Sequence, residues 1–366
     1  MPKKIAIIVG TRPNFIKITQ FEKEFDQYGD YFEYKLIHTG QHFDENMSDI
    51  FFKQFGLKEP DVYLNVKGLT PAHQIGKIIT ELSSFFNQYQ PDFVMVVGDV
   101  NSTLAAAIAA NKCNVRIGHL ESGLRSHDRE MPEEINRILA DAITNDFFVT
   151  EESGIENLKM EIKRKANIFL VGNTMIDTLV NFDEQIQQDD ILDRLDIKHK
   201  KFVLMTMHRP RNVDTKEKLE KLLQIIHTIT EDYHLVFPIH PRTSKSMEKY
   251  GLAEQLTNNP RIIIVPPLAY LAFQKLIAAC VFVLTDSGGI QEETTFRQKP
   301  CLTLRDNTER PVTITVGSNE LVRFEVSIIQ KKIKSIQNGT FKKGKIPVMW
   351  DGKATKRIVK HLKEIL

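Results

Sequence analysis

The chain has 366 residues, of which 42% are hydrophobic and 26% charged, as in ordinary soluble enzymes and unlike disordered or fibrous chains. Lys and Arg together number 49 and Asp and Glu 47, so the net charge of +2 provides no basic excess for binding nucleic acid. At this length a single hydrophobic core stops growing, which predicts two domains.

The first apolar run, residues 5–9, ends at the turn sequence Gly10-Thr11-Arg12-Pro13, far short of the core of a signal peptide. No other run approaches the length that crosses a membrane. We therefore expect a cytoplasmic protein with no membrane partner. The three cysteines, Cys113, Cys280 and Cys301, are far apart in sequence, which predicts reduced, mostly buried thiols.

Apolar runs alternate with helical patterns through the first half of the chain. This alternation predicts a parallel sheet whose functional residues lie at the carboxyl ends of the strands. The strand at residues 5–9 leads through a turn into a helix with Pro13 near its start, and Arg12 and Lys17 are the cations at this junction. Further strands are expected near residues 35–38, 93–97, 115–120, 146–150 and 168–171.

Three carboxylates follow these strands closely. Asp99 and Glu121 come after the third and fourth predicted strands, and Glu133 lies in the first turn of the next helix. Acids that converge at strand ends are suited to general acid and base catalysis. A structural alternative stays open for each, since Asp99 could cap a helix and Glu133 could only offset a helix dipole. Glu121 could form an internal ion pair with Arg125 or Arg137.

The second half repeats the pattern, with strands expected at residues 202–207, 234–239, 261–265, 281–285 and 300–305. His208 and His240 follow the first two of these strands. The fourth breaks at Ser287-Gly288-Gly289 into a helix, and the N–H groups of a first helical turn beside glycines form a seat for a diphosphate. Glu293 could then reach a ribose hydroxyl. The alternatives are a plain tight turn and a scaffold role for His208.

Metal and cofactor signals are poor. Only His38 and His42 are close enough in sequence for a zinc pair, and the turn residues Thr39 and Gly40 lie between them. The dinucleotide motif GxGxxG is absent, which disfavours NAD-dependent sugar chemistry. We expect no metal and no external cofactor.

The motifs taken together, in order from residue 5 to residue 322, resemble the non-hydrolysing UDP-N-acetylglucosamine 2-epimerases. They are Gly10-Thr11-Arg12-Pro13, Thr39-Gly40-Gln41-His42, Gly98-Asp99, Glu121-Ser122-Gly123-Leu124-Arg125, Pro132-Glu133-Glu134-Ile135-Asn136-Arg137, His208-Arg209, and the segments 286–293 and 305–311. The resemblance implies an α/β fold of the glycosyltransferase-B type, with two Rossmann-like αβα domains facing a deep cleft. We expect the first domain at residues 1–170, completed by a C-terminal helix at 353–366, and the second, UDP-binding domain at residues 171–352.

The resemblance also implies an isomerase that interconverts UDP-N-acetylglucosamine and UDP-N-acetylmannosamine for surface polysaccharide synthesis. In this family UDP is eliminated in the anti sense, a 2-acetamidoglucal is left, and UDP is re-added after a proton returns to the other face of C2. By motif match, Asp99, Glu121 and Glu133 carry the acid–base role and His208 serves the leaving group. The matched substrate contacts are Arg12, Lys17, His42, Arg137, His240, Leu268, Phe273 at the uracil, Ser287, Gly288, Gly289, Glu293 at the ribose, and Arg310. The family suggests a homodimer.

Several features depart from the family pattern, and other activities stay open. Asn14 stands where relatives commonly have Glu, and Pro210 follows His208-Arg209 where Arg is frequent. A 2-epimerase of another UDP-2-acetamido sugar, such as UDP-diacetamido-glucuronic acid, is the nearest alternative, with Arg211 as a partner for the C6 carboxylate. A glycosyltransferase of the same fold and a non-catalytic UDP-sugar sensor are disfavoured by the three carboxylates.

Overall fold

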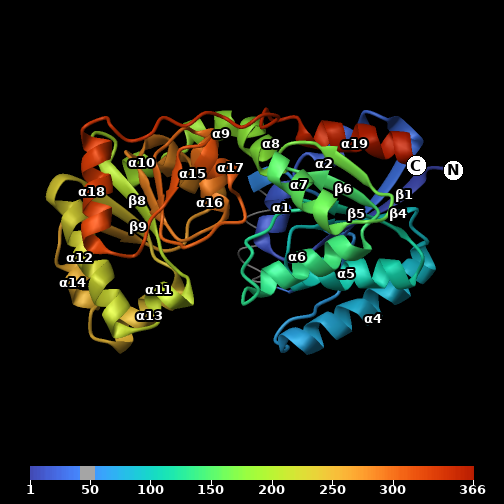
Figure 1. The fold of residues 1–366 in the computed structure, drawn as a ribbon, viewed down its shortest axis with the longest axis horizontal. Helices are drawn as coiled ribbons and strands as arrows, with labels where there is room; N and C mark the ends of the chain where they lie inside the picture. The colour runs from blue at the N-terminus through green and yellow to red at the C-terminus, as the bar shows by residue number, and fades with distance from the viewer. Residues whose placement is uncertain (42–53) are drawn as a thin grey trace. The chain divides into compact units, whose positions relative to one another are not determined.

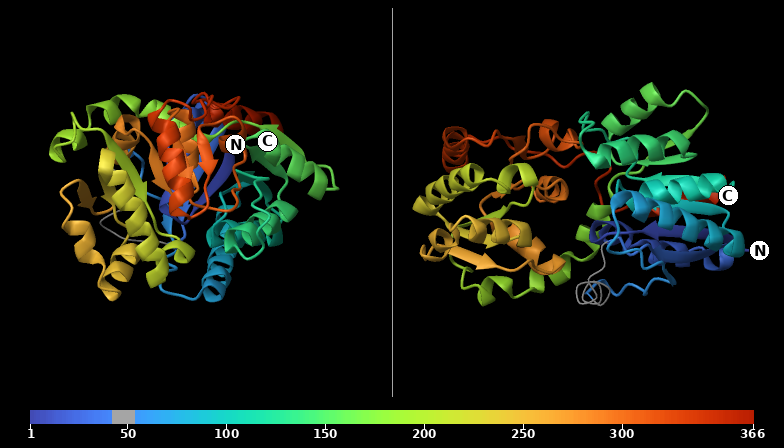
Figure 2. Two further views of the ribbon diagram at one scale, coloured as in Figure 1. Left: turned by 60° about the vertical axis from the view of Figure 1, so that its left-hand side comes forward. Right: turned by 90° about the horizontal axis from the view of Figure 1, so that it is seen from below.

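The computed structural model describes residues 1–41 and 54–366, which form two compact α/β units. The first unit comprises Met1–Asn181 with Val348–Leu366, and the second comprises Phe182–Pro347. In each unit helices cover a parallel sheet (Figures 1 and 2). Each unit therefore has a hydrophobic core of its own.

The sheet of the first unit has seven parallel strands in the order β3-β2-β1-β4-β5-β6-β7. The strands are β1 (Lys3–Val9), β2 (Phe32–His38), β3 (Val62–Tyr63), β4 (Phe93–Val97), β5 (Arg116–Leu120), β6 (Asp146–Val149) and β7 (Asn167–Leu170). The helices are α1 (Arg12–Ile18), α2 (Phe21–Asp26), η1 (Gly29–Tyr31), α4 (Pro71–Tyr89), α5 (Asn101–Lys112), α6 (Pro132–Ile143), α7 (Glu152–Glu161), α8 (Thr174–Asn181) and α19 (Ala354–Ile365).

The sheet of the second unit has six parallel strands in the order β10-β9-β8-β11-β12-β13. The strands are β8 (Phe202–Thr206), β9 (His234–Pro238), β10 (Ile262–Val265), β11 (Val283–Thr285), β12 (Cys301–Thr303) and β13 (Asn319–Leu321). The helices are α9 (Asp183–Gln188), α10 (Ile191–Arg194), α11 (Pro210–Val213), α12 (Lys216–Asp232), α13 (Pro241–Lys249), α14 (Ala253–Thr257), α15 (Tyr270–Ala279), α16 (Gly289–Phe296), α17 (Val312–Thr315) and α18 (Val326–Gln337).

The sequence pattern explains how these elements pack. Strand β4 is a continuous apolar run, and all five of its residues are buried, as expected for a parallel strand covered on both faces. Helix α5 is rich in alanine on the face that meets its neighbours, which lets α4 and α6 approach it closely. Helix α4 buries one face only, formed by Gln74, Ile78, Leu82, Phe86 and Tyr89.

Helix α8 and the segment before α19 belong to the first unit, whereas the sequence placed the domain changes at residues 170 and 352. Thr178 of α8 donates a hydrogen bond to the carbonyl of Ile16 in α1. Asp177 accepts the backbone N–H groups of Ala354 at 2.9 Å and Thr355 at 2.6 Å, and so caps α19, which packs beside α2 (Figure 1). Trp350, only 1% exposed, donates to the carbonyl of Thr150 at 3.1 Å and holds the returning chain.

The strand order reverses at one point in each sheet, between β1 and β4 in the first unit and between β8 and β11 in the second. In doubly wound sheets, ligands bind outside the carboxyl ends of the strands at such a switch point. The loops that begin at Gly10, Gly98, Met207 and Asp286 follow these four strands. They contain Asp99, His208, Ser287 and Gly288, four of the residues that the sequence singled out.

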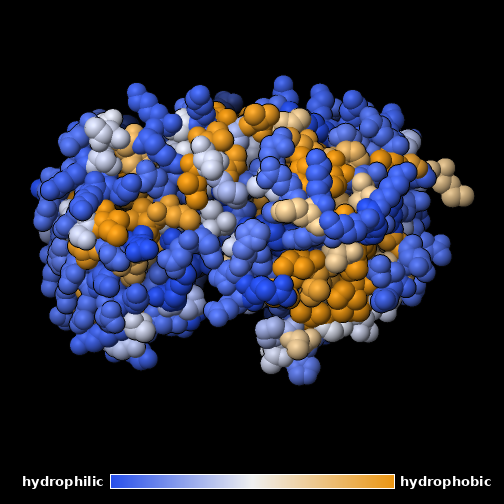
Figure 3. Space-filling model, in the orientation of Figure 1, coloured by the Kyte–Doolittle hydropathy of each residue, from blue (hydrophilic) through white to orange (hydrophobic). Residues whose placement is uncertain are grey.

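The surface and the cysteines agree with the composition. The face shown in Figure 3 is mainly hydrophilic, with smaller areas of apolar side chains. Within the described part of the chain, no helix has the length and apolar character needed to span a membrane. Cys113, Cys280 and Cys301 are free thiols, and burial raises the pKa of Cys280 to about 12 and that of Cys301 to about 11.

Candidate active site

The turn after β1 is built around Asn14, which lies in α1. Its Oδ1 accepts the backbone N–H groups of Gly10 at 3.0 Å and Thr11 at 3.1 Å, and its Nδ2 donates to the carbonyl of Val97 at 3.1 Å. An amide can accept and donate at once, which an ionised Glu cannot do. Asn14 therefore ties the tips of β1 and β4 together. Arg12, at the first position of α1, is half-buried.

Glu121 forms an ion pair with Lys17, and both side chains are 7% exposed. The sequence had also offered Arg125 or Arg137 as the ion-pair partner of Glu121. Arg125 contacts Asp141, with 2.7 Å between Nη2 of Arg125 and Oδ2 of Asp141. Lys17 thus holds a carboxylate in this structure, and its role as a UDP contact stays a prediction.

The backbone around Glu121 is constrained. Glu121 has a φ of 68°, in the left-handed region that costs a non-glycine residue about 1–2 kcal/mol. Gly98 has a φ of 69°, and a Cβ at Gly98 would lie 3.1 Å from Nζ of Lys17 and 3.9 Å from Oε2 of Glu121. The absence of a side chain at Gly98 therefore lets the tip of β4 lie directly against the ion pair.

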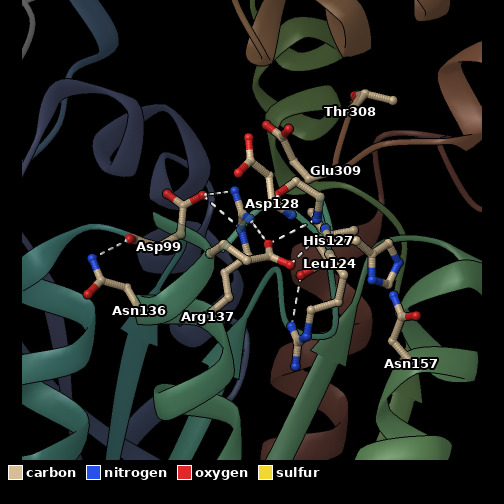
Figure 4. A network of polar contacts seen from close by, with 12 residues as sticks. Asp99, Leu124, His127, Asp128, Asn136, Arg137, Asn157, Thr308 and Glu309 are labelled. Carbon is tan, nitrogen blue, oxygen red and sulfur yellow. Dashed lines mark hydrogen bonds and ion pairs between the residues drawn. The ribbon is translucent and has the colours of Figure 1, made fainter. Parts of the chain in front are cut away.

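Asp99 is held by helix α6. Arg137 donates to its Oδ2 from Nη2 at 2.8 Å and from Nε at 3.1 Å, and Asn136 donates to its backbone carbonyl at 2.9 Å. Figure 4 shows the side chains of Asp99 and Arg137 pointing toward each other. Helix α5 has Val100 at its N-cap with no side-chain cap, so Asp99 does not serve as the cap.

Arg137 has a second carboxylate partner, Glu134, on the same helix. Glu134 is 1% exposed and also accepts the backbone N–H groups of Ser126 and His127, each at 2.9 Å. Arg137 itself is 2% exposed, so a buried cation holds the carboxylate of Asp99. Glu133, one residue earlier in the first turn of α6, is exposed.

In the second unit, His208 is paired with Asp286. The Nδ1 of His208 lies 2.9 Å from Oδ1 of Asp286, whose side chain is fully buried, while the side chain of His208 is 39% exposed. Asp286 also accepts the backbone N–H of Arg209 at 2.8 Å and Nδ2 of Asn212 at 3.1 Å. Burial would raise the pKa of Asp286, but the contacts with His208, Arg209 and Asn212 outweigh it, so the pKa is lowered. Asp286 is therefore a fixed anion behind the His208 ring.

His240 has a structural partner as well. Its Nδ1 accepts the backbone N–H of Arg242 at 3.1 Å and caps α13. Its ring centre lies 5.5 Å from that of His208. Burial, and then the neighbouring His208, lower the pKa of His240, which favours its neutral form.

The Ser287-Gly288-Gly289 turn leads into α16 as predicted, and all three residues are partly exposed. A Cβ at Gly288 would lie 2.8 Å from Oε1 of Glu309 and 3.0 Å from Nη1 of Arg310, so a side chain there would have to displace these two charged groups. Arg310 is 5% exposed and pairs with Glu292 of α16 at 2.8 Å and with Glu309. These contacts place the 305–311 loop against the start of α16.

The remaining predicted contacts of the second unit lie around α15 and α16. Glu293 is 5% exposed, and burial, followed by the charge of Glu293, raises the pKa of Tyr270 well above its usual value. Phe273 and Leu268 are partly buried and pack against the same hydrophobic cluster. His42 lies outside the described residues. Within residues 1–41 and 54–366, no group of three or more His, Cys, Asp and Glu is arranged to hold a metal ion.

Asp286 was not predicted as a site residue, although the motif 286–293 that contains it was recognised. The signal was available, because Asp286 directly follows a buried strand, as Glu121 does, and Asp99 follows its own strand with only Gly98 between. Asn14 was noted only as a departure from the family pattern. Its neighbours in the sequence do not reveal that it bridges two strands.

Two doubly wound sheets, with carboxylates at the tips of one and His, Gly and Arg residues at the tips of the other, define an α/β enzyme of the glycosyltransferase-B fold class. The chain belongs to the UDP-N-acetylglucosamine 2-epimerase family, whose model matches residues 24–363. It is therefore an isomerase.

Individual relatives agree with this assignment. A UDP-N-acetylglucosamine 2-epimerase of Methanococcus maripaludis is 40% identical over 91% of this chain and 92% of its own. The crystal structure of Methanocaldococcus jannaschii UDP-GlcNAc 2-epimerase in complex with UDP-GlcNAc and UDP superimposes with a TM-score of 0.89, at 38% identity over 99% of both chains. A UDP-2,3-diacetamido-2,3-dideoxy-D-glucuronate 2-epimerase of Pseudomonas aeruginosa is 37% identical over 99% of this chain and 100% of its own.

Proposed function

We propose that this enzyme interconverts UDP-N-acetylglucosamine and UDP-N-acetylmannosamine by eliminating UDP and adding it back. The observation that carries the proposal is the arrangement of the first unit, where Asp99 and Glu121 follow neighbouring strands and each is held by a buried cation. The relatives from M. maripaludis and M. jannaschii, which bear the name of this activity, support the choice of substrate.

The carboxylates of the first unit fit the chemistry at the sugar. The proton at C2 has no adjacent carbonyl to acidify it, so the C1–O bond must break first, leaving positive charge on the ring. Carboxylates stabilise such charge and move protons, as they do in glycoside cleavage. In our proposal Asp99, Glu121 and Glu133 share these tasks. One carboxylate takes the C2 proton, and a proton returned to the other face of C2 completes the epimerisation with no net change in protons.

The second unit fits the leaving group. Because Asp286 occupies Nδ1 of His208, Nε2 is the nitrogen that would face the departing diphosphate. The start of α16, with Ser287, Gly288 and Gly289, and the nearby Arg310 would hold the diphosphate through N–H groups and positive charge. Glu293 would bind the ribose and Phe273 the uracil, as the resemblance implies. Bound UDP then stays available for re-addition.

The nearest alternative substrate is a UDP-diacetamido-uronic acid, as in the name of the P. aeruginosa relative. Arg211 was the residue that kept this alternative open. Its Nη1 lies 3.1 Å from Oδ2 of Asp306, so its charge already has a carboxylate partner in this structure. We therefore favour UDP-N-acetylglucosamine.

A direct comparison of substrates tests the proposal. We expect kcat/KM for UDP-N-acetylglucosamine to exceed that for the diacetamido-uronic acid by at least about 100-fold, since a site must stabilise one transition state better to discriminate. The reverse order would replace the substrate but keep the mechanism. Formation of a glycosylated acceptor, with no epimer, would instead indicate a glycosyltransferase.

Three further features belong to this proposal. We propose a homodimer located in the cytoplasm that supplies UDP-N-acetylmannosamine for a surface polysaccharide. These features rest on the family resemblance. Light scattering of the purified protein should give twice the mass of the 42.1 kDa chain. A monomeric mass at working concentration would contradict the dimer.

A further inference from the structure

A fully buried polar network lies behind the carboxylates of the first unit. It consists of His119 in β5, Asp141 in α6 and Arg125 in the loop after β5, and the side chains of His119 and Asp141 are 0% exposed. Nδ1 of His119 lies 2.6 Å from Oδ1 of Asp141, and Nε2 lies 2.7 Å from the carbonyl oxygen of Gly98. Oδ2 of Asp141 accepts Nη2 of Arg125 at 2.7 Å.

The hydrogen-bond inventory of His119 decides its charge. A peptide carbonyl can only accept, so Nε2 must carry a hydrogen. Oδ2 of Asp141 accepts from Nη2 of Arg125 at 2.7 Å and from the backbone N–H of Gly123 at 3.1 Å, and these donors favour the carboxylate form of Asp141. Nδ1 must then carry a hydrogen too, and the ring is an imidazolium. Arg125 also pairs at 2.7 Å with Glu161, whose side chain is 39% exposed, so two cations face two carboxylates in this cluster.

The network contacts both backbone turns that present the catalytic candidates. Gly98 directly precedes Asp99, and its carbonyl is the group that His119 holds. On the other side, Asp141 accepts the backbone N–H of Gly123 at 3.1 Å, two residues after Glu121. Glu121 is itself in the left-handed conformation, which persists only where surrounding contacts enforce it.

We propose that His119 is a positioning residue, which, as an imidazolium between the Gly98 carbonyl and Asp141, fixes the turns that carry Asp99 and Glu121. The proposal rests on the proposed function, because it assigns those two carboxylates to the reaction. His119 is too deeply buried to touch the substrate itself, so its effect must act through the two turns.

The first test is the spectrum of the wild-type ring. Proton and ¹⁵N NMR of histidine-labelled enzyme at pH 7.5 should show two exchange-protected N–H signals from one ring, both absent in His119→Gln. A single N–H from His119 would overturn the imidazolium. This measurement needs neither substrate nor turnover, so it decides the charge of His119 even if the proposed function fails.

The second test separates positioning from stability. His119→Gln keeps a similar length but cannot donate to both acceptors, and we expect kcat to fall about 30- to 100-fold with KM within about threefold, because small displacements of catalytic groups cost rate. The matched control is Asp146→Asn, since Asp146 is also buried but pairs with Arg116 at the amino ends of β6 and β5, with 2.7 Å between Oδ2 and Nε. The control should lower Tm and leave kcat within about twofold.

Several outcomes would overturn the proposal. A His119→Gln enzyme that is folded and keeps kcat within about threefold of wild type would do so, as would an equal loss of kcat in Asp146→Asn. If His119→Gln does not fold, Asp141→Asn takes its place, with the same expected loss of kcat. A wild-type enzyme with no epimerase activity would contradict the proposed function, while the ring spectrum would still report on His119.

Discussion

Replacing Asp286 by Asn should remove the fixed anion behind His208 while keeping the size and shape of the side chain. Asp286 receives only donors: Nδ1 and the backbone N–H of His208, the backbone N–H of Arg209 and Nδ2 of Asn212. An Asn side chain must turn its own N–H groups toward one side of this ring of donors. The negative charge beside the His208 ring is lost in either orientation.

The magnitude follows from the geometry. Opposite unit charges about 4 Å apart interact by roughly 4 kcal/mol at the effective dielectric constant near a protein surface. His208 is 39% exposed, so solvent screens part of this energy. We expect Asp286→Asn to lose about 2–3 kcal/mol of transition-state stabilisation, which corresponds to an approximately 30- to 160-fold lower kcat.

The assay is the initial rate of UDP-N-acetylmannosamine formation, measured at several pH values on enzyme whose folded fraction is known from thermal unfolding. Asp214→Asn is the matched control, because Asp214 lies in the same unit and its carboxylate pairs with the exposed Arg242 at 2.7 Å. Its kcat should stay within about twofold of wild type. A folded Asp286→Asn enzyme with wild-type kcat and pH profile would refute the role given to the pair.

Three further predictions concern the first unit. Arg137→Lys should lower kcat about tenfold, because a lysine cannot present two N–H donors of one rigid fork to Asp99. Lys17→Met should lower the free energy of unfolding in urea by about 3–5 kcal/mol, since buried Glu121 loses its ion-pair partner. Burial lowers the pKa of His38 to about 4, so an unfolded chain binds this proton first as the pH falls. Relative to pH 8, the wild type should therefore lose about 2 kcal/mol by pH 5 and about 3 kcal/mol by pH 4 that His38→Phe does not lose.

Each of these has a contrasting variant or result. The contrasting variant for Arg137→Lys is Arg242→Lys, since Arg242 forms an exposed ion pair in the second unit. Its kcat should stay within about twofold of wild type, and an equal loss of kcat in both variants would contradict a special role for Arg137. Adding Glu121→Gln to Lys17→Met should restore much of the stability but no activity, because the buried charge that lost Lys17 is gone and the carboxylate with it. Equal acid sensitivity of the wild type and His38→Phe would show that His38 is not buried neutral.

The tips of the strands could be predicted from the sequence because parallel buried strands are continuous apolar runs, and the first polar residue after each run lies at the edge of the sheet. Asp99, Glu121 and His208 were found in this way. The family resemblance then added residues such as Leu268 and Phe273, whose roles no local pattern reveals.

The partners of these residues could not be predicted, because each pairing depends on competition among charges that are distant in the chain. Arg125 and Arg137 are nearer to Glu121 in sequence, but Arg125 pairs with Asp141 and Arg137 pairs with Glu134. Glu121 pairs with Lys17, 104 positions away.

The domain limits were hard to place for a similar reason. The chain leaves β7 at residue 170 and turns at Gly172, whose φ is 87°, so the local pattern breaks there. The packing of α8 on α1, which keeps the next helix in the first unit, has no local signature.

The proposed reaction eliminates UDP, exchanges the C2 proton and adds UDP back. We would test it first by proton NMR of the enzyme with UDP-N-acetylglucosamine in deuterated water, without added NAD or metal. The account predicts UDP-N-acetylmannosamine with deuterium at C2. Retention of the original proton at C2 in the epimer would contradict this mechanism. Free N-acetylmannosamine with UDP would mean that water, and not UDP, adds to the intermediate.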